Sequence, residues 1–97
     1  MSSDHVDLFL DEANFAVGAP AGSIRLTPAE FRLLAHLLDC TGEVVNRADL
    51  LAVVLAHGMV MSDAAFDECI ATLQSKLARS GSSRSLEVAP PFGYRLG

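Results

Sequence analysis

Apolar residues recur along this chain with the period of a helix in three separate stretches. The first begins at Thr27, which can cap a helix, with Pro28 at the first helical position and Glu30 placed to close a capping box. Behind it, apolar residues follow at helical spacing at Phe31, Leu34, Ala35 and Leu38. This pattern predicts a helix over residues 28–40 with one strongly buried face.

Two further helices are predicted by the same reasoning. Asn46 can cap a helix over residues 47–56, whose apolar positions are Leu50, Leu51, Val54 and Leu55. Ser62 or Asp63 can cap a third helix over residues 63–78, with Phe66, Cys69, Ile70, Leu73 and Leu77 on one face. The opposite face of this third helix carries small and polar residues, so it needs no burial.

The remaining segments have extended character. Three short runs rich in Val, Leu, Phe and Ile, at residues 6–11, 14–17 and 23–26, are separated by turn residues and predict an N-terminal antiparallel sheet within residues 6–26. Val44-Val45 reads as a brief extended link, and residues 86–96 read as a hairpin. The predicted fold class is α+β in one domain over residues 1–97.

Charge restricts the possible partners. The chain has 97 residues and a formal net charge of −5. Residues 1–60 hold eight carboxylates and three arginines, whereas the remainder holds four acidic and four basic residues. The C-terminal part is therefore the part least repelled by a polyanion, although it is not strongly basic.

The chemistry-bearing residues favour a binding protein over an enzyme. Cys40 and Cys69 lie in apolar stripes, which predicts buried, unreactive thiols, and His5, His36 and His57 have no ligands at metal-binding spacing. We expect no cofactor, no metal and no small-molecule ligand. The longest apolar run, Leu50 to Ala56, is seven residues, short of the ~18 to 20 needed to span a bilayer. We expect no membrane partner and a cytoplasmic location.

Three motifs stand out within these elements: Leu26-Thr27-Pro28-Ala29-Glu30-Phe31, the frame Asp67-x-x-Ile70-x-x-Leu73-x-x-Lys76-Leu77 and the final Gly93-Tyr94-Arg95-Leu96. Together with the order of the elements, they resemble the OmpR/PhoB-type winged-helix effector domain of bacterial response regulators. The resemblance covers about Asp7 to Leu96. It implies a winged helix-turn-helix: the second and third helices form the helix-turn-helix, the third reads DNA, and residues 86–96 form the wing.

The resemblance also implies a DNA-contacting surface on this chain. That surface would comprise Ala64, Glu68, Ala71, Thr72, Gln74, Ser75, Lys76 and Arg79 of the third helix, and Pro90, Tyr94 and Arg95 of the wing. Family members carry arginines at several positions where this chain has Ala64, Ala71, Thr72 and Gln74. We therefore expect a transcription-regulatory domain whose DNA binding is weakened or depends on a partner.

Three alternatives stay open on the sequence alone. The outer face of the third helix either touches DNA or is an ordinary solvated face, and Tyr94 either contacts phosphate or packs on the helix. Met59-Val60-Met61 either meets a protein partner, such as RNA polymerase, another regulator or a second copy of the chain, or closes the fold locally. The rival function is a winged helix reused for protein interaction or dimerisation without DNA binding.

Overall fold

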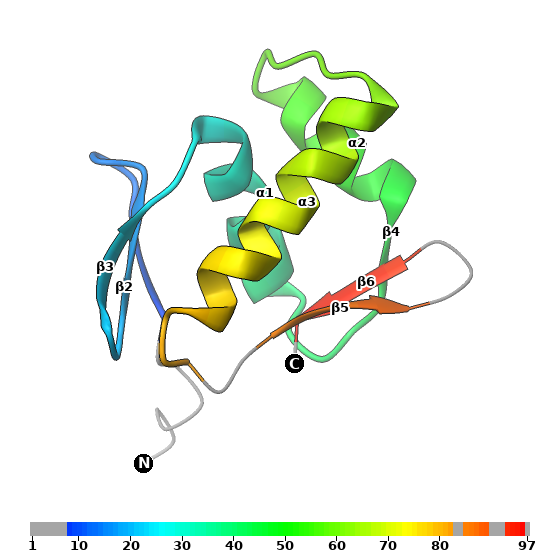
Figure 1. The fold of residues 1–97 in the computed structure, drawn as a ribbon. Helices are drawn as coiled ribbons and strands as arrows, with labels where there is room; N and C mark the ends of the chain where they lie inside the picture. The colour runs from blue at the N-terminus through cyan, green and yellow to red at the C-terminus, as the bar shows by residue number, and fades with distance from the viewer. Residues whose placement is uncertain (1–7, 83–84, 90–92, 97) are drawn as a thin grey trace.

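Three helices lie between two small antiparallel sheets in the computed structural model, which describes residues 8–82, 85–89 and 93–96 (Figure 1). The strands of the first sheet are β1 (Phe9–Asp11), β2 (Ala16–Ala19) and β3 (Gly22–Arg25), in the order β1-β2-β3. The helices are α1 (Pro28–Asp39), α2 (Arg47–Ala56) and α3 (Asp63–Ala78). The second sheet has the order β4-β6-β5, from β4 (Val45–Asn46), β5 (Leu86–Ala89) and β6 (Gly93–Leu96). The predicted α+β winged-helix architecture is confirmed.

The predicted helix caps are all present. The Thr27 hydroxyl accepts from the Glu30 amide at 3.2 Å, and the Glu30 carboxylate accepts from the Thr27 amide at 2.9 Å, which completes the capping box. Asn46 caps α2 through the Asp49 amide, and Ser62 caps α3 through the Ala65 amide. The observed α2 and α3 have the predicted bounds, whereas α1 ends one residue early, with Cys40 as its C-cap.

The N-terminal strands differ from the predicted runs at their ends. Strand β2 starts at Ala16 and not at Asn14, because Phe15 takes a left-handed backbone conformation with φ of 47° and belongs to the turn. The turn between β2 and β3 consists of Pro20-Ala21 alone, since Ala19 pairs with Gly22, and Gly22 has a φ of +126°. Residues 6–7 of the first predicted run lie outside the described residues.

The wing was predicted as two strands, and this prediction was incomplete. Val45 pairs with Tyr94 and Asn46 with Gly93, so the link before α2 is a third strand, β4, at the edge of the wing sheet. Val45 is buried and β-branched, which suits a strand. The wing is therefore tied to the start of the helix-turn-helix. Residues 90–92 at its tip lie outside the described residues.

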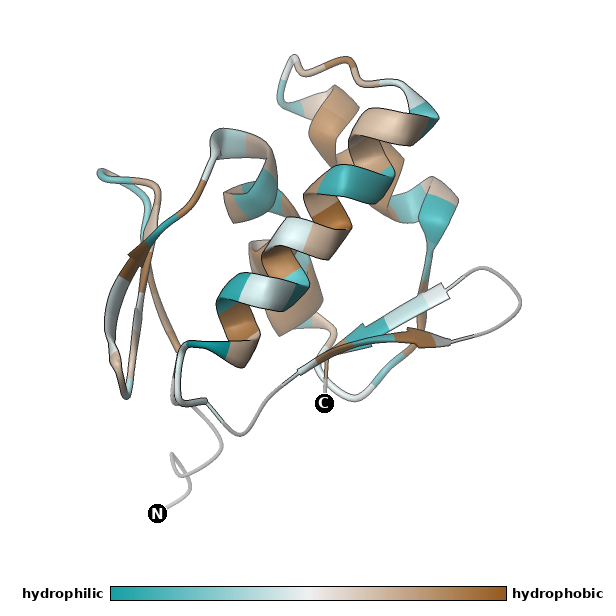
Figure 2. Ribbon diagram, in the orientation of Figure 1, coloured by the Kyte–Doolittle hydropathy of each residue, from teal (hydrophilic) through white to brown (hydrophobic). Residues whose placement is uncertain are grey.

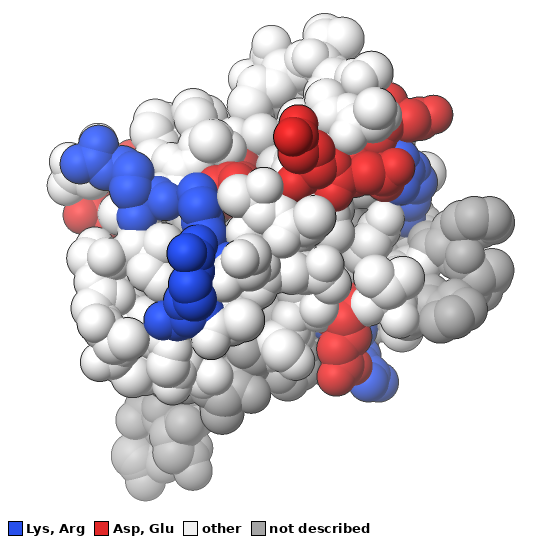
Figure 3. All heavy atoms as spheres, viewed as in Figure 1, with Lys and Arg blue, Asp and Glu red and all other residues white. Residues whose placement is uncertain are grey.

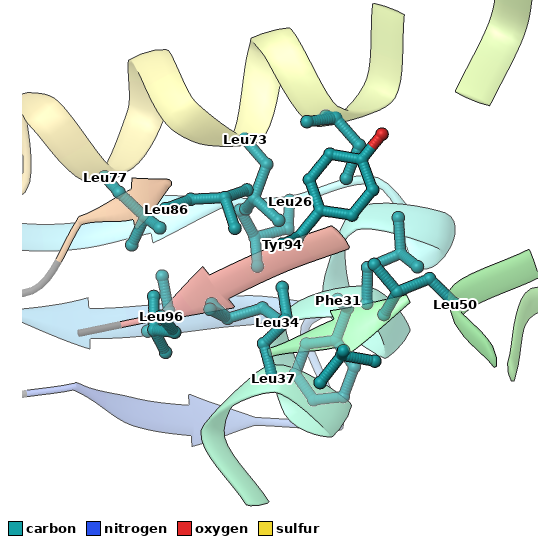
Figure 4. Packing of buried hydrophobic residues seen from close by; sticks show 14 of the residues in the cluster. Leu26, Phe31, Leu34, Leu37, Leu50, Leu73, Leu77, Leu86, Tyr94 and Leu96 are labelled. Atoms are coloured by element: carbon teal, nitrogen blue, oxygen red, sulfur yellow. The ribbon is translucent and has the colours of Figure 1, made fainter. Parts of the chain in front are cut away.

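One hydrophobic core joins the helices to both sheets. Figure 4 shows Leu73 and Leu77 of α3 above Leu86, Tyr94 and Leu96 of the wing sheet, with Leu34 and Leu37 of α1 on its other side. Each of these side chains is buried. Since α3 buries one stripe here, its opposite face is fixed toward solvent beside the wing.

Candidate nucleic-acid interface

Helix α3 presents one face to solvent along its length. Phe66, Ile70, Leu73 and Leu77 point into the core, so the polar and small residues between them lie outside. In the orientation of Figure 1, this face of α3 crosses the front of the molecule with the β5–β6 hairpin next to its C-terminal half, and Figure 2 shows hydrophilic and neutral residues along it. Gln74 ties the two elements together, because its Nε2 donates to the Leu86 carbonyl at 2.9 Å.

The N-terminal half of the α3 face is acidic. Ala64 and Glu68 are exposed there, and Ala71 is exposed just past the midpoint of the helix, as predicted from the helical period. Asp63 and Asp67 lie on the same half and are exposed as well. Figure 3 shows acidic side chains gathered over this part of the surface. In helix-turn-helix proteins the N-terminal residues of the recognition helix contact base edges, and in this chain the first turns of α3 carry negative charge.

Arg47 lies at the junction of α2, α3 and the wing. Its Nη1 donates to Asp67 at 2.6 Å and to the Tyr94 hydroxyl at 3.2 Å, and its Nη2 donates to the Asp63 carbonyl at 3.2 Å. The guanidinium also lies 4.6 Å from the centroid of the Phe66 ring. The hydrogen bond with Asp67 raises the pKa of Arg47. This arginine is therefore used inside the fold and is not available to phosphate.

The C-terminal half of the α3 face is basic. Thr72 is half-buried, whereas Ser75 and Arg79 are exposed. Lys76 bends back across the surface: its Nζ donates to Glu30 of α1 at 2.6 Å and to the Arg25 carbonyl of β3 at 3.1 Å. Glu30 is only 3% exposed, so this is a largely buried ion pair. Lys76, predicted to contact DNA, thus already has a carboxylate partner.

Cys69 lies beneath this face as a half-buried thiol. Burial, with the nearby negative charge of Glu30, raises its pKa to about 11. A thiol held protonated is a poor nucleophile and metal ligand. The expectation of an unreactive cysteine agrees with this environment, and Cys40 is also a free thiol.

Tyr94 and Arg95, the described wing residues that were predicted to contact DNA, both have partners within the fold. Tyr94 is 7% exposed and packs edge-on against Phe66 with ring centroids 6.0 Å apart, so the packing interpretation of Tyr94 is the one observed. Arg95 is exposed but pairs with Glu87 on the neighbouring strand at 2.5 Å. Pro90 lies outside the described residues.

The α2–α3 loop closes the fold with two of the three residues Met59-Val60-Met61 and exposes the third. Met59 and Met61 are partly buried and pack against the core, which closes the fold, whereas Val60 is 88% exposed. With Leu55, itself 62% exposed, these residues line a shallow apolar hollow beside α2. Of Met59, Val60 and Met61, only Val60 is thus exposed enough to place its whole side chain against a partner.

Two basic residues on this surface have free side chains. Among residues 8–82, 85–89 and 93–96, Arg25 and Arg79 are the Lys and Arg side chains that make no ion pair or hydrogen bond. Arg25 was not predicted to be part of the site, because it ends β3, far from α3 in sequence, and no local pattern links the two. The prediction for the other α3 and wing positions stays a prediction.

Two other kinds of site find no support in the described part of the chain. No group of three or more His, Cys, Asp or Glu side chains there is arranged to hold a metal ion. None of the described helices is long and apolar enough to cross a membrane.

Comparison with known proteins gives a consistent result. The family model described as "Transcriptional regulatory protein, C terminal" matches residues 21–96. The transcriptional regulatory protein AfsQ1 of Streptomyces coelicolor is 30% identical over 98% of this chain but 43% of its own length. The chain thus spans less than half of that relative.

Solved structures share the fold. The DNA-binding domain of Bacillus subtilis CssR is 27% identical with a TM-score of 0.73, covering 93% of this chain and 99% of its own. The response regulator AdeR DNA-binding domain, solved in complex with an intercistronic region, has a TM-score of 0.75 at 21% identity and covers 93% of this chain and 92% of its own. Because the family model matches most of this chain, the chain belongs to the family of C-terminal domains of bacterial transcriptional regulatory proteins, of the OmpR/PhoB response-regulator type.

Proposed function

We propose that this domain docks a larger transcription regulator onto duplex DNA, with low affinity and little base discrimination of its own. The observation that carries the proposal is the solvent-facing α3 beside the wing, with its free cations confined to one end. The AdeR domain, which shares this fold, was solved in complex with an intercistronic region, which supports a DNA-binding role for this fold here. The role is one of binding without catalysis, and binding chromosomal DNA implies a cytoplasmic location.

The charges on the face set the expected strength. Arg25 and Arg79 are free, and Lys76 shares its charge with Glu30. Two to three phosphate contacts give a slope of log K against log salt of about −2 to −3, since each contact contributes about −0.9. A fourfold increase in salt should then weaken binding by roughly 12-fold for two contacts and 40-fold for three. Groove-reading proteins with six or more contacts lose far more.

Sequence discrimination is also expected to be small. Ala64 and Ala71 have no hydrogen-bonding groups, and the Gln74 amide donates to Leu86. A bidentate side chain on a base is worth about 1 to 3 kcal/mol of discrimination, and this face offers no free arginine in its N-terminal half. A second DNA-binding copy or a partner protein would have to supply the remaining affinity.

Fluorescence anisotropy with labelled duplexes of several sequences, between 50 and 200 mM salt, tests this proposal. Glu68→Gln removes a carboxylate from the α3 face and should tighten binding several-fold. Asp39→Asn makes the same charge change on α1, beside a hollow between α1 and α2, and should have a much smaller effect. Tight, sequence-specific binding by the wild-type domain, or no binding at 50 mM salt, would contradict the proposal.

A second function is favoured by one observation, the nearly full exposure of Val60 next to Leu55. An apolar contact with a protein partner, such as RNA polymerase, another regulator or a second copy of this chain, would bury these side chains and would survive high salt. Sedimentation velocity at 1 M salt tests self-association, and a pull-down at raised salt tests RNA polymerase. Loss of the complex with Val60→Asp, but not with the polar control Ser62→Asp outside the hollow, would support this function.

A further inference from the structure

The turn of the N-terminal sheet is fixed against the end of α3. The Ala21 amide, between β2 and β3, donates to the Ser80 carbonyl just after α3 at 2.8 Å. The two segments approach so closely that a Cβ added at Gly81 would lie 3.2 Å from the Ala21 nitrogen. Lys76 adds the hydrogen bond to the Arg25 carbonyl at the far end of β3. The sheet and the C-terminal half of α3 therefore hold a fixed relative position.

This arrangement brings three cationic side chains from two elements together. Arg79 is the C-cap of α3 and follows Lys76 by three residues with helical backbone angles, so it lies on the same side of the helix. Arg25 is the neighbouring basic residue on β3, because Lys76 reaches its backbone carbonyl. The Arg25 residue also lines a surface hollow with Asp11 and Asn14. Figure 3 shows the basic side chains on this part of the surface as one continuous patch beside the outer face of α3. We call Arg25, Lys76 and Arg79 the β3–α3 patch.

The β3–α3 patch has free hydrogen-bonding capacity. The guanidinium groups of Arg25 and Arg79 are exposed and have no partner in the described parts of the chain, and each offers up to five donors. The Lys76 ammonium has three donors and uses two, on Glu30 and Arg25. One donor is left, so Lys76 can bind an anion without breaking its ion pair.

The N-terminal half of α3 repels an anion. Asp63, Asp67 and Glu68 lie there, and the one arginine nearby is held by its own hydrogen bonds. A polyanion lying along α3 is therefore repelled at the N-terminal half and attracted at the C-terminal half. The favourable position is displaced toward the N-terminal sheet.

We propose that the β3–α3 patch is a phosphate-binding site for the backbone of duplex DNA, with Arg25 of the N-terminal sheet as one of its ligands. This inference rests on the proposed DNA-binding function and adds a residue outside the helix-turn-helix and wing. Two guanidinium groups and an ammonium suit phosphodiester oxygens, which accept charge-assisted hydrogen bonds. Contacts of this kind position a duplex without reading its sequence.

The test compares salt slopes for Arg25→Gln and Arg79→Gln with those of the wild-type domain, by anisotropy on one labelled duplex. Each substitution should flatten the slope by about 0.9. Ala52→Glu on α2 makes the same change in net charge away from the patch and should leave the slope unchanged. Arg25→Lys should keep the wild-type salt slope, since the positive charge is retained. Both arginines have free side chains, so the unfolding midpoints of the variants should equal that of the wild type.

The outcomes separate the two proposals. If the wild-type domain binds DNA and the slope falls with Arg79→Gln but not with Arg25→Gln, the N-terminal sheet takes no part and the inference is overturned while the proposed function stands. If Ala52→Glu flattens the slope as much as Arg25→Gln, the effect is one of net charge and the inference is overturned as well. An absence of DNA binding by the wild-type domain at 50 mM salt overturns both.

Discussion

Lys76→Met should destabilise the domain strongly, because it removes the counter-charge of a buried carboxylate. Glu30 is 3% exposed, and its Oε1 accepts from Lys76 at 2.6 Å and from the Thr27 amide at 2.9 Å. Methionine keeps most of the apolar stem of lysine but lacks the ammonium. The variant leaves Glu30 buried with a single hydrogen bond.

Breaking a buried pair from one side costs about 3 to 5 kcal/mol of stability. The Lys76 side chain is 20% exposed, so solvent screens part of the interaction, and we expect the lower end of that range, about 3 kcal/mol. For a domain of this size, that loss corresponds to a fall in Tm of roughly 12 to 24 °C. Glu30→Gln should cost less, about 1 kcal/mol, because a glutamine keeps the capping box and the lysine can turn toward water.

Urea unfolding of the two single variants and the double variant gives the coupling free energy, which should be about 2 kcal/mol. Arg95→Met is the matched control, because it breaks the Arg95–Glu87 pair, in which both side chains are 47% exposed. That exposed pair should contribute less than about 1 kcal/mol. Equal losses for Lys76→Met and Arg95→Met, or a coupling below about 0.5 kcal/mol, would refute the reasoning.

Two further predictions concern the same region. Thr27→Ala removes the oxygen that caps α1 and should lower the free energy of unfolding by about 1 kcal/mol, whereas Thr27→Ser should retain it; equal unfolding midpoints for the two would contradict this account. In a Cys40→Ser background, the alkylation rate of Cys69 should rise with pH to a midpoint at about 11, in line with its raised pKa. A midpoint near 9.0, the ordinary pKa of a thiol, would argue against burial. Because this pKa is raised in the folded state, the thiol's contribution to stability is intact below pH 9 and should fall as the pH rises toward 11, since the unfolded chain ionises first.

The helices were predictable because their signals are local. Capping residues lie within three positions of the amides they bind, and the buried stripe of α3 repeats every three to four residues. Strand β4 was missed because two residues show no periodicity and their partner, β6, lies more than 40 residues later in the chain. The left-handed conformation of Phe15 was missed for a related reason, since non-glycine residues rarely adopt it.

The site was harder to predict than the fold. Helical periodicity placed Lys76 and Gln74 on the outer face of α3, but it gives no information on where a long side chain ends. Lys76 reaches Glu30, 46 residues away in sequence, and Gln74 reaches the wing. Arg25 joins the surface only through the packing of the N-terminal sheet. Sequence alone therefore predicted which side of α3 faces solvent, while leaving open which of the cations on it are free.

The central claim is that DNA lies over the C-terminal half of α3 and the adjoining end of β3. Titrating the ¹⁵N-labelled domain with a duplex and following amide chemical shifts tests this claim most directly. We expect the largest shifts around Arg25, Lys76 and Arg79, with much smaller ones around Asp63 and Val60. Shifts centred on the first turns of α3, or none at 50 mM salt, would contradict it.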